Sequence, residues 1–230
     1  MATEAELTAL DQQVGDGDFG TNLVAGLRAT LRRLDAPESA EATADRGADA
    51  LSDAASSATV SAAPASTPAA GPGAEAAGPL RAAADAFLDE VGGTSGPLFG
   101  LLFQELAVTV RAKGAEAPTA ALALGMSNGL AAIQRVGEAE VGDKTLVDAL
   151  APAVATLSAS CSADPGRALA EAAEAAWQGV RATARGTARR GRASYLGDRA
   201  AGVPDPGAVG VALLLTAANT PATTLPPHLA

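Results

Sequence analysis

The 230-residue chain is poor in the residues that build disulfide frameworks and β-sheets. It contains one cysteine (Cys161), one histidine (His228) and only 3% aromatic residues. A single cysteine excludes an internal disulfide framework, and the first residues lack the basic start and apolar run of a signal peptide, so we expect a cytoplasmic protein. Because alanine supplies much of the 48% hydrophobic content, the composition favours close-packed helices over a sheet.

Positive charge and long apolar runs are also scarce. The formal net charge is -10, which argues against nucleic acid as the main partner because a phosphate backbone requires a cationic face. An anionic ligand would therefore need a bound cation. The longest apolar stretch, 207–218, is shorter than the ~20 residues of a membrane-spanning helix, so the sequence predicts no contact with a membrane through such a span.

The alanine-rich composition predicts an all-α protein, and we expect a single domain over residues 1–230. Residues 36–79 contain almost nothing large to bury, which predicts a flexible insertion. A short helix near 41–51 is left as an open alternative. Residues 220–230 are expected to form a tail. Apolar residues elsewhere recur at helical spacing and stop at glycine or proline. The predicted helices begin at Thr21 as N-cap, at Leu80, at Pro97, at Thr119, at Asp143 as N-cap, at Asp164-Pro165 and at Asp205-Pro206. A helical bundle or barrel is the simplest architecture.

The densest cluster of functional side chains is the stretch 10–22, Leu-Asp-Gln-Gln-Val-Gly-Asp-Gly-Asp-Phe-Gly-Thr-Asn. Asp11, Asp16 and Asp18 are close to three glycines, so we expect them on a tight turn between helices, where they repel one another unless a cation neutralises them. Carboxylate oxygens select magnesium, manganese or calcium, and magnesium is commonly shared with substrate phosphates. The stretch therefore predicts a metal-nucleotide site, although taken alone it fits a solvated turn equally well.

Two sharper interpretations of this stretch fail. It contains the G-x-G-x-x-G spacing at Gly15, Gly17 and Gly20, but no strand precedes it, and the intervening aspartates would repel a pyrophosphate. As a calcium loop starting at Asp16 it lacks an oxygen ligand at Gly20, and Leu27 stands where the closing glutamate belongs.

Three further loops carry anion-binding chemistry. Residues 92–100 (GGTSGPLFG) put small hydroxyl side chains and backbone amides at a helix N-terminus, although the loop alone favours an ordinary capped turn. Residues 137–146 resemble a P-loop until Asp143 separates the glycine from the lysine, so this is not a Walker motif. In residues 191–207, Arg192 can pair with phosphate oxygens beside a helix start at Asp205; the alternative is a solvated basic loop, and Arg189 and Arg190 are expected on a solvated helix face.

In this order, the four segments resemble the L subunit, or L domain, of dihydroxyacetone kinase. The shared motifs are L-D-x-x-x-G-D-G-D-x-G, G-G-T-S-G-P-L, G-D-K-T and G-R-A-S-Y-L-G-x-R followed by D-P-G. The resemblance covers nearly the whole chain outside the 36–79 insertion and the tail. It implies an antiparallel helical barrel with ADP or ATP and two magnesium ions at one end.

The resemblance also assigns residues. It implies that Asp11, Asp16 and Asp18 hold the two magnesium ions and that Arg192, together with magnesium, positions and polarises the terminal phosphate. Two magnesium ions would offset the carboxylates and part of the diphosphate, so no basic surface is needed. The implied nucleotide contacts are Phe19, Gly20, Thr21, Asn22, Thr94, Ser95, Gly137, Leu146, Arg192, Asp205, Pro206 and Gly207.

In the resembled family, the phosphate passes to dihydroxyacetone held on a histidine of a separate K subunit or domain. The only histidine here, His228, lies in a Pro-rich tail, so the chain would act as the nucleotide half of a two-part kinase. In some relatives a phosphotransferase M subunit rephosphorylates the bound ADP, whereas in others ATP exchanges instead. Whether the chain forms a homodimer is left open.

Two departures keep other functions in view. Phe19 replaces the usual histidine, and only ten residues precede Asp11, where the family has a further helix. The alternatives are a non-catalytic nucleotide sensor, the L-domain piece of a single-chain ATP-dependent kinase, and a degenerate helical scaffold.

Overall fold

The computed structural model describes residues 3–36, 72–220, 224–225 and 229. The described residues form eight α-helices and one 3-10 helix and contain no strand, which confirms the all-α class. The helices are α1 (Glu4–Val14), α2 (Phe19–Asp35), α3 (Pro72–Glu90), α4 (Ser95–Lys113), α5 (Pro118–Gly137), α6 (Val147–Ala159), α7 (Pro165–Arg185), η1 (Arg192–Ala200) and α8 (Pro206–Ala217).

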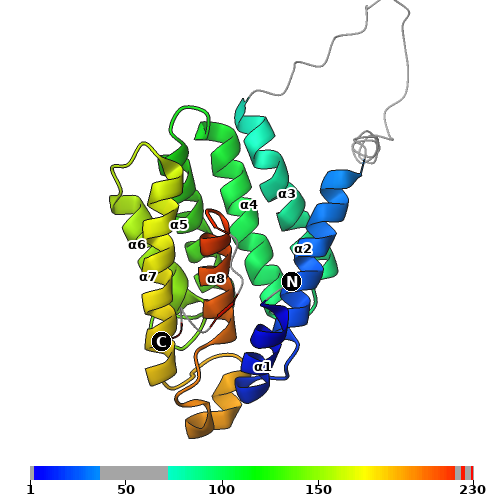
Figure 1. Cartoon of the computed structure of the whole chain (residues 1–230), viewed down its shortest axis with the longest axis vertical. Coiled ribbons are helices and arrows are strands. Elements are labelled where there is room, and N and C mark those ends of the chain that lie inside the picture. Colours follow the sequence, from blue (N-terminus) through cyan, green and yellow to red (C-terminus); the bar gives the residue numbers. More distant parts are fainter. Residues whose placement is uncertain (1–2, 37–71, 221–223, 226–228, 230) are drawn as a thin grey trace, which may run out of the picture.

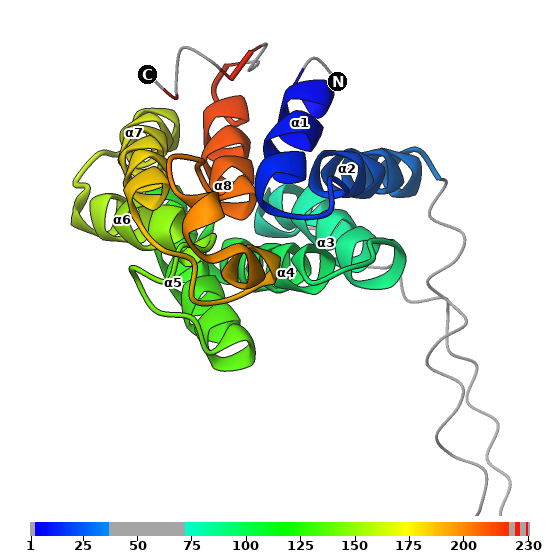
Figure 2. The ribbon, with the colours of Figure 1, turned by 90° about the horizontal axis from the view of Figure 1, so that it is seen from below.

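From α2 to α8 the α-helices alternate in direction, and each packs against the next (Figure 1). The ring closes because α8 contacts α1 and α2 as well as α6 and α7 (Figure 2). One apolar cluster fills the interior, with members from every α-helix: Leu7, Leu23, Phe87, Phe99, Met126, Leu150, Trp177 and Val209. The α8 segment is apolar on all sides because it is surrounded by other helices.

Local sequence explains two of the helix starts. Asp164 accepts a hydrogen bond from the Gly166 amide, and Asp205 accepts one from the Ala208 amide at 2.7 Å. Proline follows each aspartate at the first helical position, where its missing N–H is not needed. The predicted starts of α7 and α8 are therefore confirmed.

Other predicted starts were wrong. Thr21 does not cap α2, which begins two residues earlier with Asp18 at the N-cap position. Asp143 does not cap α6, because that helix begins at Val147. Helix α3 begins at Pro72, not at Leu80, so 72–79 belong to a helix and not to the expected insertion. The helices predicted from Pro97 and Thr119 are confirmed, with starts one or two residues earlier at Ser95 and Pro118.

Other expectations fall wholly or mostly on residues that the structure does not describe. These are the flexibility of 37–71, the short helix near 41–51, and the tail with His228. None of the described helices is both long enough and apolar enough to cross a bilayer.

Candidate nucleotide and metal site

The alternating helix directions bring four helix N-termini to one end of the barrel. Helices α2, α4, α6 and α8 all begin at this end (Figure 1). A pocket of about 220 Å³ lies there and is lined by the first residues of all four helices, including Phe19, Ser95, Val147 and Pro206. Helix N-termini carry unpaired amide hydrogens and the positive ends of helix dipoles. Backbone alone therefore favours an anionic ligand at this end, despite the net negative charge of the chain.

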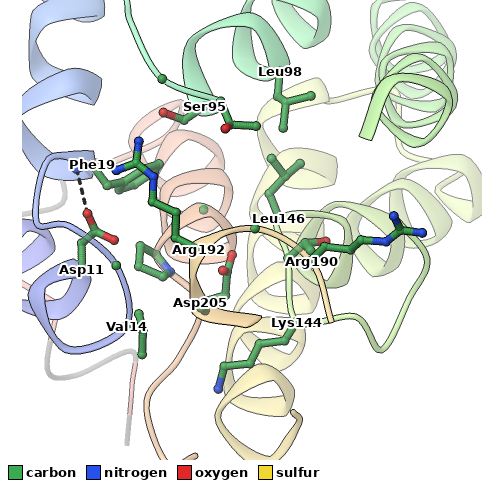
Figure 3. Close-up of a pocket in the computed structure, with 18 of the residues that line it drawn as sticks. Asp11, Val14, Phe19, Ser95, Leu98, Lys144, Leu146, Arg190, Arg192 and Asp205 are labelled. Atoms are coloured by element: carbon green, nitrogen blue, oxygen red, sulfur yellow. Dashed lines mark hydrogen bonds between the residues drawn. The ribbon is translucent and has the colours of Figure 1, made fainter. Parts of the chain in front are cut away.

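Asp11 fixes the corner between α1 and α2. It lies in the last turn of α1, so the expectation that all three aspartates share a loop was wrong for this residue. The Asp11 side chain is buried and accepts a hydrogen bond from the Phe19 amide at 3.0 Å (Figure 3). A Cβ at Gly15 would overlap the Asp11 carboxylate, and Gly17 has a φ of +78°, a conformation that favours glycine. The glycines thus allow the chain to fold tightly around this carboxylate.

The three aspartates converge as expected for a metal site. One carboxylate oxygen from each of Asp11, Asp16 and Asp18 lies within 4.8 Å of the other two. Asp11 supplies a buried anchor, whereas the Asp16 and Asp18 side chains are 44% and 49% exposed and face the pocket. An all-oxygen set with two accessible members fits magnesium or manganese, which keep water and phosphate ligands in addition to carboxylates. These residues can hold the ions that the sequence predicts.

Arg192 supplies the positive charge that balances this cluster in the structure. Its guanidinium pairs with Asp16 and lies 3.8 Å from an oxygen of Asp18. Arg192 comes from the start of η1, in the segment that links α7 to α8 and crosses the mouth of the barrel (Figure 2). Its side chain extends across the pocket toward Asp11 and Phe19 (Figure 3). The only member of the predicted set with a cationic side chain thus lies directly beside the predicted metal ligands.

Most of the other predicted nucleotide contacts line the same pocket. These are Phe19, Thr94, Ser95, Gly137, Leu146, Asp205, Pro206 and Gly207. Gly20, Thr21 and Asn22 do not line it. Gly20 is buried where α2 crosses α1, and a Cβ there would lie 2.6 Å from the Glu4 carbonyl oxygen. Thr21 is exposed, and the Asn22 amide lies near Gly93, on the α4 side of the pocket mouth.

Asp205 combines a structural and an electrostatic role. Its side chain caps α8, and its backbone N–H donates to Thr183 Oγ1 at 2.9 Å. Desolvation by the surrounding protein raises the pKa of Asp205 to about 7, with Asp148 and Asp11 adding to the rise and Lys144 and the Ala208 hydrogen bond opposing it. A carboxyl group whose pKa is raised well above its ordinary value therefore lines this pocket.

Sequence reasoning missed Arg190 as a pocket residue and was wrong about the location of Arg189 and Arg190. Arg190 lines the pocket, and neither it nor Arg189 belongs to the solvated helix face that was expected, because α7 ends at Arg185. Arg190 pairs with Glu138 at 3.5 Å, and both arginines lie within 4.0 Å of Asp143. The Asp143 carboxylate, which does not cap α6, also accepts a hydrogen bond from the Glu140 amide. The loop before α6 and the segment before η1 are thus held together by charge, which spacing along the sequence could not reveal.

Phe19, which stands where the resembled family has histidine, packs into the apolar core. Its side chain is 7% exposed, and its ring centroid lies 6.2 Å from that of Phe99. Its para carbon also fills the space that a side chain at position 210 would need. The Phe19 amide is already hydrogen-bonded to Asp11. Position 19 therefore contributes packing and supports Asp11, and it offers no polar side chain to the pocket.

Comparison with known proteins agrees with the motifs. A family model described as the DAK2 domain matches residues 55–220. The chain is 33% identical over 202 residues to the PEP-dependent dihydroxyacetone kinase 2 ADP-binding subunit DhaL of Listeria innocua, covering 87% of this chain and 78% of that protein. It is 36% identical over 215 residues to L-erythrulose 1-kinase of Mycolicibacterium smegmatis, covering 93% of this chain but 32% of that protein.

Solved structures share the fold. The native dihydroxyacetone kinase of C. freundii matches with a TM-score of 0.60 and 24% identity, over 94% of this chain and 31% of that chain. The same kinase in complex with AMP-PNP and Mg2+ matches with a TM-score of 0.59. This chain thus spans about a third of the longer kinases and most of the separate DhaL subunit. On the domain match and the 33%-identical relative, the chain belongs to the DAK2 domain family, which includes ADP-binding subunits of dihydroxyacetone kinases.

Proposed function

We propose that the chain is the nucleotide-binding component of a ketose kinase. It binds ADP or ATP with two magnesium ions and passes the terminal phosphate to dihydroxyacetone, or to a related short ketose, held by a separate K component. The observation that carries the proposal is the convergence of Asp11, Asp16 and Asp18 within 4.8 Å, beside Arg192 and four helix N-termini.

The two halves of the pocket suit the two parts of the ligand. Magnesium held by the three carboxylates supplies charge neutralisation for the phosphates. The amides at the starts of α4 and α8 (Ser95 and Gly207) are positioned to bind phosphate oxygens, and α4 has no side-chain cap of its own. Leu146, Ile133 and Leu98 give the pocket an apolar wall that suits a nucleobase or ribose.

Arg192 is the residue to which we assign the catalytic role. Its side chain is 51% exposed at the mouth, so it can change partners without disturbing the core. With the carboxylates neutralised by metal, the guanidinium is free to pair with oxygens of the terminal phosphate through a bidentate contact. Charge that develops on the transferring group is stabilised by such a cation.

Calorimetric titration of ADP tests the nucleotide site. We expect binding with magnesium and none with a chelator. The matched variants are Asp16→Asn, in the carboxylate cluster, and Asp164→Asn, at the N-cap of α7 at the opposite end of the barrel. Loss of binding in Asp16→Asn alone supports the site; binding that ignores magnesium in the parent protein contradicts it.

Reconstitution tests the kinase role and its acceptor. Mixed with a K component and magnesium-ATP, the chain should phosphorylate dihydroxyacetone or erythrulose, since relatives are named for both ketoses. Retention of ADP through gel filtration indicates recharging by an M subunit, and rapid exchange indicates ATP as donor. A homodimer is tested by light scattering, and a location in the cytoplasm by fractionation.

A nucleotide sensor is the second candidate, because Phe19 presents no polar group to the pocket. Magnesium-dependent ADP binding with no transfer in the presence of any K component would favour it.

A further inference from the structure

Lys144 is one of two lysines in the chain, and its side chain is almost completely buried, with 2% of the residue exposed. Its ammonium group donates hydrogen bonds to the carbonyl oxygens of Val203 at 2.7 Å, Ala200 at 2.8 Å and Thr183 at 2.9 Å, and lies 3.4 Å from that of Gly186. An ammonium has three hydrogens to donate, so the three short bonds use all of them. Lys144 is thus a fully bonded buried cation.

The bonded carbonyls come from chain segments that end at the same point. Thr183 lies in the last turn of α7, Ala200 ends η1, and Val203 precedes the cap of α8. Helix C-termini leave carbonyl oxygens without partners and carry the negative ends of helix dipoles. A cation among them satisfies several acceptors at once. Thr183 O also accepts from the Gly186 N–H at 3.1 Å, so the Ala200 and Val203 carbonyls depend most on Lys144.

The backbone of Lys144 is arranged for this contact. Its φ is +61°, a left-handed conformation that few residues other than glycine adopt. Lys144 lines the pocket, but in Figure 3 the ammonium end of its side chain points away from Ser95. A phosphate-binding role of the P-loop kind is therefore excluded for its ammonium, which is already committed to backbone oxygens.

These bonds affect Arg192 because Arg192 lies in the sequence between two of the bonded carbonyls, those of Thr183 and Ala200. We call residues 186–205 the strap; it carries Arg190, Arg192 and Asp205 to the pocket. The fully buried apolar members of the strap are the small side chains of Ala188, Ala193 and Ala200 around Val14, while the larger Leu196 and Val203 are only partly buried. Other contacts that hold the strap are the ion pairs of Arg189 and Arg190 and single hydrogen bonds, such as Gly202 N–H to Ala184 O at 2.9 Å.

We propose that Lys144 is a positioning residue: a tethered cation that fixes the strap and, through it, holds Arg192 over the three carboxylates. The consequence for phosphate binding rests on the proposed function, whereas the consequence for the strap does not. Lys144 lines part of the pocket, but its ammonium is bonded to backbone oxygens of α7 and the strap. We therefore expect its effect on the nucleotide to pass through the strap, which carries both Arg192 and Asp205.

The first test uses the protein without nucleotide. Lys144→Ala removes three methylene groups and the ammonium, a volume that n-propylammonium can refill. Hydrogen exchange of the strap amides should quicken about tenfold or more in Lys144→Ala, as expected when hydrogen bonds to a charged group are lost. Added n-propylammonium should restore slow exchange, whereas n-propanol, which has nearly the same shape and no charge, should not. Lys113→Ala, at the exposed far end of α4, is the matched control.

If Lys144→Ala fails to fold, Lys144→Met keeps the volume and removes the charge, and the same increase in strap exchange is expected. Restoration by n-propanol as well as by n-propylammonium would reduce Lys144 to a space-filling residue and overturn the proposal. So would exchange that stays at the parent rate in both variants.

The second test links the strap to the nucleotide. The affinity for magnesium-ADP should fall about tenfold in Lys144→Ala and recover with n-propylammonium, while Mn²⁺ affinity without nucleotide does not fall. A matching loss of Mn²⁺ affinity would mean that the whole site has collapsed, and would contradict a role through Arg192. If the parent protein binds no magnesium-ADP, the proposed function fails, and the exchange experiment alone decides the role of Lys144.

Discussion

Arg192 forms an ion pair with Asp16 across the mouth of the barrel, although the two residues lie at opposite ends of the chain. The pair joins the segment before α2 to the segment before α8. Both side chains are about half exposed, so water screens the pair and its contribution to stability is small. The pair matters for the chemistry of the site. A bound phosphate would pair with the guanidinium and a bound metal with the carboxylate, and these two groups already lie side by side.

Asp16 and Asp205 should separate metal binding from helix capping. We expect Asp16→Ala to abolish magnesium-dependent ADP binding while leaving the free energy of unfolding nearly unchanged, because its side chain is 44% exposed and pairs with the half-exposed Arg192. Asp205→Ala should lower the free energy of unfolding by about 1 kcal/mol through loss of the α8 cap. Calorimetry and urea unfolding of both variants measure the two effects; equal loss of nucleotide affinity would contradict this division.

Arg192→Met should impair transfer more than binding of metal. Removing the guanidinium takes away a charge that pairs with the terminal phosphate, and a loss of about 100-fold in kcat is expected for such a stabilising group. Mn²⁺ affinity should stay equal or rise, because the competing cation is gone. Arg167→Met is the control, since Arg167 pairs with Glu171 in the first turn of α7 at the far end of the barrel. Unchanged kcat in Arg192→Met would remove this residue from the catalytic role.

The raised pKa of Asp205 makes stability depend on pH. The folded-state pKa is about 7 and the ordinary value is 3.8, so the folded state holds the proton more tightly than the unfolded chain does. The stabilising contribution of this proton is complete below about pH 4 and is lost as the pH rises through 7. Asp205→Asn keeps a capping oxygen and cannot titrate.

Urea unfolding between pH 4 and pH 8, without metal, compares the two proteins. The parent protein should lose stability relative to Asp205→Asn as the pH rises, since each unit of pKa difference corresponds to about 1.4 kcal/mol. Parallel pH profiles would show that Asp205 titrates in its ordinary range.

Phe19→His should restore the family motif at the expense of packing. The Phe19 ring is buried against Phe99 and α8, so a histidine there places a polar ring in an apolar environment and should lower the free energy of unfolding by about 1–3 kcal/mol. Phe19→Leu, which stays apolar, should lose less. Nucleotide affinity should change little in Phe19→His, because the amide of residue 19 remains bonded to Asp11. A large gain in affinity or transfer would instead mean that Phe19 had suppressed the activity.

Local sequence was sufficient wherever one residue decides the local conformation. The starts of α7 and α8 were predicted because an aspartate followed by proline caps a helix through its own side chain. Thr21 and Asp143 belong to residue types that favour caps, but neither is a cap, because α2 begins at Phe19 and α6 at Val147. Asp143 faces Arg189 and Arg190. Single-domain organisation, the flexibility of 37–71 and the individual nucleotide contacts stay predictions.

The resemblance of the four ordered motifs to the L subunit of dihydroxyacetone kinase indicated that they share one functional site. The amino-acid sequence by itself determined the helical class and the short acidic stretch that contains Asp11, Asp16 and Asp18. These follow from composition, from helical spacing and from the mutual repulsion of nearby carboxylates, all of which act over short stretches of chain. Only the tertiary structure decided that Asp11 belongs to a helix, that Arg192 lies over Asp16, and that Lys144 binds backbone oxygens instead of phosphate. Those outcomes depend on where helices of alternating direction end in space, because burial and charge pairing between distant segments leave no periodic signal in the sequence.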